Sequence, residues 1–396
     1  MRIFDITHAY QPFEPPDFVP SWVADNLRQI FIPISRAMKE GVVKRHVQLQ
    51  GWTIDAFLKA PDPIKSLARE FLDNLKVASD QGHIRLGFSG YSHPILPLLS
   101  DEVLIRSIKE DYSVIEEHLG KPTWFWFPEG ACDRRSLEIL FKEFPDVYAV
   151  IPDGSLGKQN FSGFLTLEGG GKVVVCNSVL KDIFMNALDY GKLQSYSPEG
   201  LSQEVAEKMV SDGKALADGL GYFAEGDAVL ARDLENAGSK YGLFEFEKGS
   251  KELKSFYEGN SSVKFAFVED GTFGGSLSLD AILPSSWEPL ADEKNPYPYW
   301  NLPSWVDFGN VFCEVYKKDF LKQYLVVLAS DVPWHILARK EWGPNPEHSQ
   351  HFVRDVVMPV VRDIGEFDLI RAAEALLKDL NQFSPKPPGR GPHPSA

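Results

Sequence analysis

A carboxylate and several indole rings lie close together in the segment from Trp124 to Gly130, which reads Trp-Phe-Trp-Phe-Pro-Glu-Gly. The aromatic run has the composition of a short strand, and Glu129 follows at its end. A carboxylate can attack an anomeric carbon or protonate a leaving group there, and flat aromatic faces pack on the apolar faces of pyranose rings. The segment therefore points to an enzyme that acts on sugars. The alternative is an ordinary buried strand followed by a solvated loop acid.

Polar or aromatic residues follow nearly every predicted strand. Apolar runs predict strands near residues 2–7, 44–49, 83–88, 124–127, 147–151, 172–176, 228–232 and 263–268. In a parallel barrel the active site lies at the carboxyl ends of the strands, so the residues directly after the runs are candidates. They are His8, Gln11, Gln50, Trp52, Ser89, His93, Glu129, Asp153, Asn177, Asp182, Asp233, Glu235, Glu269 and Asp270.

Amphipathic helices are predicted between these strands. One has Asp62 as its N-cap and Pro63 at its first position, and another begins at Ser100 and ends at Gly120. Alternating strands and helices predict an α/β fold whose parallel sheet curls into a (β/α)-type barrel. The glycines 169–171 are not followed by Lys-Ser/Thr in a P-loop frame, so they predict a hairpin or loop rather than a phosphate site.

The pattern changes after residue 280, so we expect a catalytic barrel over residues 1–280. Trp- and Pro-rich loops then lead into helical periodicity over 304–328, 347–363 and 367–382, which predicts helices packed on the barrel within residues 281–383. Of the tryptophans there, Trp287, Trp300, Trp334 and Trp342, only Trp334 is expected to line a cleft. The Pro-rich end, 384–396, predicts a disordered tail.

Composition restricts the partners. Hydrophobic residues at 43% and charged residues at 24% are typical of a soluble globular protein, and a net charge of -15 argues against nucleic acid and anionic membranes. A neutral carbohydrate is compatible with this charge. Cys132, Cys176 and Cys313 are too few and too scattered for a disulfide framework or a zinc site, and the N-terminus does not resemble a signal peptide. We therefore expect a cytoplasmic protein; its oligomeric state is left open.

Five motifs occur in an order that resembles glycoside hydrolase family 57, whose members act on α-glucans and related α-linked sugars with retention. They are His8-Ala9-Tyr10-Gln11-Pro12, Gly90-Tyr91-Ser92-His93-Pro94-Ile95-Leu96-Pro97-Leu98, Trp126-Phe127-Pro128-Glu129, Asp233-Leu234-Glu235-Asn236-Ala237-Gly238 and Ala329-Ser330-Asp331-Val332-Pro333-Trp334-His335. The resemblance implies an incomplete (β/α)7-type barrel followed by a C-terminal helical region. It departs from the family at Tyr10, where a second histidine is usual, and at Ala237, where a bulky residue is commoner.

The resemblance also implies roles. Glu129 would be the nucleophile and Asp233 the acid/base; Asp270 is the alternative acid/base, because Glu269-Asp270-Gly271 begins a variant of the fourth motif. Such a pair of carboxyl groups must lie about 5–5.5 Å apart in a retaining enzyme. The substrate would contact His8, Gln11, His93, Trp126, Glu235, Asp331, Trp334 and His335.

Three functions remain open from the sequence: a retaining α-glycosidase resembling α-amylases, a 4-α-glucanotransferase, and a non-catalytic glycan-binding homologue. No cofactor is expected. No metal is expected either, because nothing after Asp5 or His93 supplies the paired histidines of metal-dependent deacetylases. His348 and His351 lie near Glu347, but histidines spaced in this way at a helix start are usually solvated.

Overall fold

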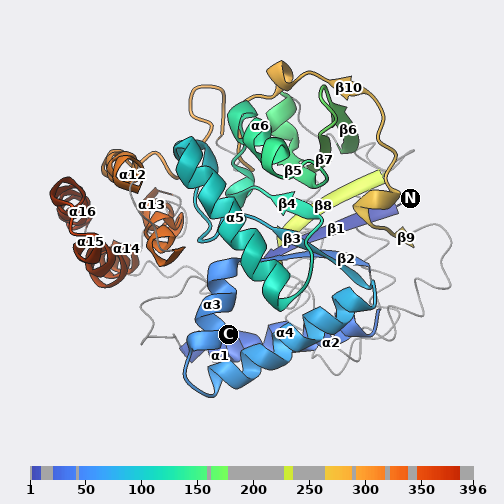
Figure 1. Ribbon diagram of the computed structural model, residues 1–396, viewed down its shortest axis with the longest axis horizontal. Coiled ribbons are helices and arrows are strands. Elements are labelled where there is room, and N and C mark those ends of the chain that lie inside the picture. Colours follow the sequence, from blue (N-terminus) through green and yellow to red (C-terminus); the bar gives the residue numbers. More distant parts are fainter. Residues whose placement is uncertain are drawn as a thin grey trace, which may run out of the picture.

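The chain folds around one curved sheet (Figure 1). The computed structural model describes residues 2–9, 21–41, 44–157, 162–176, 227–234, 264–287, 291–316, 322–337 and 346–383. Its strands are β1 (Arg2–Ala9), β2 (Arg45–Leu49), β3 (Ile84–Phe88), β4 (Trp124–Trp126), β5 (Tyr148–Pro152), β6 (Gly163–Leu167), β7 (Lys172–Cys176), β8 (Asp227–Asp233), β9 (Lys264–Phe265) and β10 (Ser276–Leu277).

Parallel strands run in the order β7-β5-β4-β3-β2-β1-β8. Cα atoms of β8 come within 8 Å of β7, but no ladder joins these two strands among the described residues. The sheet is therefore the incomplete (β/α)7-type barrel that the sequence predicts. β6 forms an antiparallel hairpin with β7 through the predicted loop at residues 169–171, while β10 extends the sheet beyond β6.

Alternate residues of the strands fill the barrel and the layer outside it. Phe4 and Ile6 of β1 and Trp124 and Trp126 of β4 belong to one inner cluster. Phe125, between the two tryptophans, belongs to the large outer cluster beneath the helices. This alternation is the two-residue period expected of a strand. Trp126, the last residue of β4, therefore points into the barrel, directly before the segment that carries Glu129.

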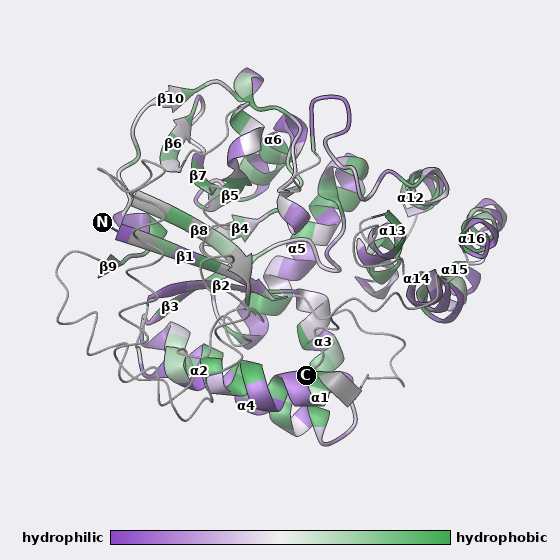
Figure 2. Cartoon of the chain, turned by 180° about the vertical axis from the view of Figure 1, so that it is seen from behind, coloured by the Kyte–Doolittle hydropathy of each residue, from purple (hydrophilic) through white to green (hydrophobic). Residues whose placement is uncertain are grey.

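The helices cover the outside of the sheet (Figures 1 and 2). The barrel region carries α1 (Ser21–Asn26), α2 (Ile32–Lys39), α3 (Gly51–Lys59), α4 (Ile64–Asp80), α5 (Asp101–His118) and α6 (Arg134–Glu143), with a π-helical turn at Leu27–Phe31. Figure 2 shows apolar and polar bands on α2 and α4, as expected of helices that bury one face. The predicted helix after Pro63 is confirmed as α4. It begins one residue later than expected, and Asp62 accepts a hydrogen bond from the Ser66 backbone N–H (3.2 Å).

The C-terminal helical region is also confirmed. It contains α12 (Pro303–Tyr316), a 3-10 segment (Lys322–Leu328), α13 (Asp331–Leu337), α14 (Pro346–Phe352), a π-helical turn (Val353–Val357), α15 (Met358–Ile364) and α16 (Phe367–Leu380). Figure 1 shows these helices as a layer on the side of α5, which α12 and the 3-10 segment contact. Within the described part of the chain, no helix is both long and apolar enough to cross a membrane. The predicted tail, 384–396, lies outside the described residues.

Candidate active site

Residues from three strand ends meet at the carboxyl end of the barrel. His8 lies near the end of β1, Trp126 ends β4, and His93 follows β3. The His8 ring is nearly parallel to both neighbours, with its centroid 5.6 Å from that of His93 and 5.4 Å from that of Trp126. All three side chains are buried. Three of the predicted site residues are thus brought together.

Glu129, the predicted nucleophile, has an unusual backbone conformation. Its φ is 57° and that of His93 is 59°, and these are the two positive values among the described non-glycine residues. A left-handed conformation costs a non-glycine residue about 1–3 kcal/mol, and such residues cluster at functional sites. The turn Pro128–Gly130 bends the chain directly after β4, and the Glu129 side chain retains 18% exposure among buried neighbours. Both described non-glycine residues with a left-handed backbone are therefore residues of the predicted site.

Two ring nitrogens face the Glu129 carboxylate. Trp287 Nε1 donates a hydrogen bond to Oε2 at 3.0 Å, and His93 Nδ1 lies 3.5 Å from Oε1. The Trp287 ring also packs on Trp126, with centroids 5.1 Å apart, and on His8, with centroids 5.4 Å apart. The expectation that only Trp334 of the C-terminal tryptophans lines a cleft is therefore wrong for Trp287. Nothing in the sequence indicates this contact, because Trp287 is 158 positions from Glu129.

The last predicted motif contacts the second one. Ser330 Oγ lies 3.0 Å from His93 Nδ1, and the Ser330 backbone N–H donates to the His93 carbonyl at 3.2 Å. Ser92 Oγ donates to the Leu325 carbonyl at 2.6 Å. The C-terminal helical region therefore holds the loop after β3 that carries His93.

The other residues of the last motif lie on α13. Trp334 is partly buried against a cluster that contains Ile95 and Trp300. The ring of His335 is buried and lies 5.2 Å from that of Trp334 and 4.1 Å from that of His348. Asp331 begins the helix and is partly buried. These contacts place the motif next to the His93 loop, while contact of its side chains with substrate remains a prediction.

Asp233, the predicted acid/base, is placed by its backbone. It ends β8 in register with His8, so its main chain lies at the same end of the barrel as the His8 stack. Four other candidates, Gln11, Asn177, Asp182 and Glu235, lie outside the described residues. Their predicted roles stay predictions.

A buried carboxylate on α5 supports two of the strand ends. Asp111 Oδ1 accepts from the Gly51 N–H at 2.6 Å and its Oδ2 accepts from the Ser89 N–H at 2.5 Å. Burial raises the pKa of Asp111 to about 7, although both hydrogen bonds act to lower it. Ser89 Oγ in turn donates to the Trp126 carbonyl at 2.6 Å. Asp111 thus ties the segments after β2 and β3 to the strand that precedes Glu129.

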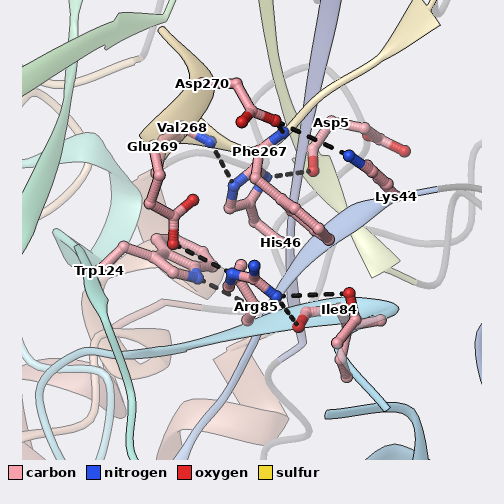
Figure 3. Close-up of polar contacts among 11 residues, drawn as sticks. Asp5, Lys44, His46, Ile84, Arg85, Trp124, Phe267, Val268, Glu269 and Asp270 are labelled. Atoms are coloured by element: carbon pink, nitrogen blue, oxygen red, sulfur yellow. Dashed lines mark hydrogen bonds and ion pairs between the residues drawn. The ribbon is translucent and has the colours of Figure 1, made fainter.

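The alternative acid/base, Asp270, lies near the amino end of β1, at the opposite end of the barrel, and Figure 3 shows its contacts there. The strand expected at 263–268 is only β9, and it pairs with Arg2 and Ile3 at the amino end of β1. Asp270 lies 3.8 Å from the Lys44 ammonium, and Glu269 accepts from Arg85 Nε at 3.0 Å. The expectation that these two acids follow a strand into the active site is wrong, because the short strand ends near the amino end of its neighbour.

No group of three or more His, Cys, Asp or Glu side chains in the described part of the chain is arranged to hold a metal ion. His351 Nδ1 lies 2.8 Å from Asp355 Oδ2 on the same helical stretch, which accounts for one of the two histidines near Glu347. The expectation of a metal-free reaction is open to a direct test.

Comparisons with known proteins agree with this fold. The crystal structure of a family 57 branching enzyme from Pyrococcus horikoshii is 14% identical with a TM-score of 0.64, over 96% of this chain and 95% of that one. The α-amylase AmyC from Thermotoga maritima is 12% identical with a TM-score of 0.63, over 96% of both chains. A 4-α-glucanotransferase from Thermococcus litoralis is 16% identical with a TM-score of 0.53, over 96% of this chain and 54% of that one.

At the level of sequence, no curated protein matches the chain. The model of glycosyl hydrolase family 57 matches residues 34–171, a range that contains the motif around His93 and the motif that ends at Glu129. This match agrees with the resemblance seen in the motifs, and over this range the chain is similar to glycosyl hydrolase family 57.

Proposed function

We propose that the protein is a retaining glycosidase or transglycosidase of α-linked glucans, with Glu129 as nucleophile and Asp233 as acid/base. One observation carries the proposal. The Glu129 carboxylate lies on a strained turn at the carboxyl end of the barrel, hydrogen-bonded by an indole N–H and next to His93, whose ring stacks on that of His8.

The reaction divides into two displacements. A Glu129 oxygen forms a bond to the anomeric carbon while the bond to the leaving oxygen breaks, and the protonated Asp233 gives its proton to that oxygen. Asp233, now ionised, then takes a proton from an incoming hydroxyl, whose oxygen attacks the anomeric carbon and releases Glu129. Two inversions give net retention. Water as the incoming group gives hydrolysis, and a sugar hydroxyl gives transfer.

The aromatic residues around Glu129 suit a pyranose ring. Trp287, which is partly exposed, offers an apolar face, and the buried rings of Trp126 and His8 pack behind it at the same end of the barrel. We assign Gln11, Glu235, Asp331, Trp334 and His335 to further sugar contacts on the basis of their motifs. A carbohydrate substrate also agrees with the net charge of -15, which disfavours polyanions.

Preference for α-glucans rests on the named structures of similar fold, which are a branching enzyme, an amylase and a glucanotransferase. The glucanotransferase likeness keeps transfer as the second candidate. A non-catalytic glycan-binding homologue is disfavoured, because the sequence keeps both acids even though Tyr10 departs from the family motif.

The test is to incubate the protein with maltooligosaccharides and an aryl α-glucoside, and to separate the products by chromatography. Glu129→Gln should lower turnover about 10³-fold or more, because it removes the attacking charge and keeps the shape. Glu269→Gln is the matched control, since it makes the same change at the other end of the barrel. Near-wild-type turnover by Glu129→Gln would overturn the assignment.

The same assays test the metal-free reaction. Dialysis against a strong chelator should leave turnover unchanged, because two carboxylates supply the chemistry. Loss of activity that returns when a divalent ion is added back would contradict the two-carboxylate mechanism. Longer maltooligosaccharides among the products would favour transfer over hydrolysis.

A further inference from the structure

We infer that Trp287 is a positioning residue for the nucleophile, holding Oε2 of Glu129 so that Oε1 is the oxygen that attacks. This inference rests on the proposed function. It is drawn from the contacts of one segment, Ser285–Trp287, which connects the barrel to the C-terminal helical region.

The backbone of this segment is paired with the turn that carries Glu129. Cys132 and Ser285 exchange two backbone hydrogen bonds, of 2.9 Å from the Cys132 N–H and 3.0 Å from the Ser285 N–H. The Trp287 N–H donates to the Glu129 carbonyl at 3.2 Å. Trp287 therefore holds Glu129 twice, through its main chain and through its indole.

Two glycines allow this close approach. A Cβ on Gly130, whose φ is +59°, would lie 3.2 Å from Trp287, and a Cβ on Gly154 would lie 2.5 Å from Ser285 Oγ. A larger residue at Gly130 would crowd the backbone of Trp287, and one at Gly154 would displace the Ser285 hydroxyl. The pairing leaves the indole little freedom to move relative to the carboxylate.

The hydrogen bond to Oε2 acts in both displacements. Before attack it favours the ionised carboxylate and fixes its orientation. Once Oε1 is bonded to the anomeric carbon, Oε2 is the carbonyl oxygen of the ester. It regains negative charge when that bond breaks, and the same N–H then stabilises the departing carboxylate.

The experiment compares Trp287→Phe with Trp124→Phe. Trp124 is the matched control because its Nε1 also donates to an oxygen, the Arg85 carbonyl at 3.1 Å, but at the amino end of β4. Trp287→Phe should lower kcat about 10- to 100-fold, the loss typical of a hydrogen bond to a charged group. It should also move the acidic limb of the kcat/KM profile to higher pH, because the carboxylate loses a donor that favours its ionised form.

A second variant removes only the donor. Replacement of Trp287 by 3-benzothienylalanine, in which sulfur stands in place of Nε1–H, keeps the ring shape and should reproduce the lower kcat and the shifted acidic limb. An unchanged kcat with a raised KM would overturn the inference, because it would show that the ring only binds sugar. If the wild type has no glycosidase activity, or Glu129→Gln keeps it, the proposed function fails instead.

Discussion

Both ends of the barrel contain a histidine, acidic residues and aromatic rings, but the contacts of these residues differ between the two ends. At the carboxyl end, Glu129 and His93 have left-handed backbones, and the carboxylate is bonded by an indole. At the amino end, both nitrogens of His46 bond to the main chain: Nδ1 lies 3.1 Å from the Asp5 carbonyl, and Nε2 accepts from the Val268 N–H at 3.0 Å (Figure 3).

Side chains at the amino end also contact one another through cation–π interactions and an ion pair. Phe267 lies beneath two cations, with the Arg85 guanidinium 3.9 Å and the Lys44 ammonium 5.0 Å from its ring centroid. Glu269 pairs with Arg85. The comparison teaches that a histidine beside an acid identifies no site by itself. The strand end at which the pair lies, and the strain of its backbone, distinguish the proposed active site from the structural pair.

The largest expected effect tests which end carries the acid/base. Asp233→Ala should lower turnover of a maltooligosaccharide by about 10²–10⁴-fold, the usual contribution of a general acid, and should largely spare the first step on an activated aryl glycoside. Azide should then restore turnover by forming a glycosyl azide. Asp270→Ala should keep wild-type kinetics, because its side chain lies beside Lys44 at the amino end.

Kinetics with each variant, with and without azide, separate the two acids. Azide rescue in Asp270→Ala and not in Asp233→Ala would make Asp270 the acid/base and would place the catalytic acid at the amino end of the barrel.

The next effect concerns stability rather than rate. The pair of Arg45 Nε and Asp5 Oδ2, 2.8 Å apart, is almost wholly buried. Arg45→Met should lower the free energy of unfolding by about 3–5 kcal/mol, because a buried carboxylate loses its cation. Arg45→Met combined with Asp5→Leu should recover most of that loss. Denaturant unfolding measures both, and an Arg45→Met variant as stable as the wild type would show that this pair contributes little.

Much of the barrel follows from local signals. The apolar runs give β1 through β5 within a residue or two, and β8 likewise, because each run alternates between an inner and an outer layer that both need apolar side chains. The apolar run at 172–176 gives β7, and the glycines at 169–171 give the turn before it, but β6 on the other side of that turn was not predicted. The motifs bring His8, His93, Trp126 and Glu129 to one end, as parallel strands require.

The missed features depend on contacts between distant segments. Trp287 reaches Glu129 only because Ser285 pairs with Cys132, and no local pattern encodes that bridge. Asp111 lies within a regular amphipathic helix, where a single acid gives no sign of its two backbone donors. Asp270 was misplaced because the apolar run before it suggests a full strand, while only two residues pair with β1.

The smallest effect contrasts the pH dependence of one buried group from each end. Burial lowers the pKa of His46 from 6.5 to about 4, so between these values the unfolded chain binds a proton that the folded protein does not. The contribution of His46 to stability is therefore lost as the pH falls. Burial raises the pKa of Asp111 from 3.8 to about 7, so there the folded protein binds the extra proton. Its contribution is lost as the pH rises.

The two slopes oppose each other in the wild type between about pH 4 and 6.5. His46→Gln should remove the rise in stability with pH, and Asp111→Asn should remove the fall. Each variant should change the free energy of unfolding by up to roughly 3 kcal/mol between the unfolded and folded pKa values of its group. Asp80→Asn, on the exposed surface of α4, is the control and should leave the slope unchanged. Free energies of unfolding measured in denaturant at half-unit steps from pH 4 to 7 give the slopes directly. Slopes that change in the same direction in both variants would show that the two ends do not differ in the way their buried groups hold protons.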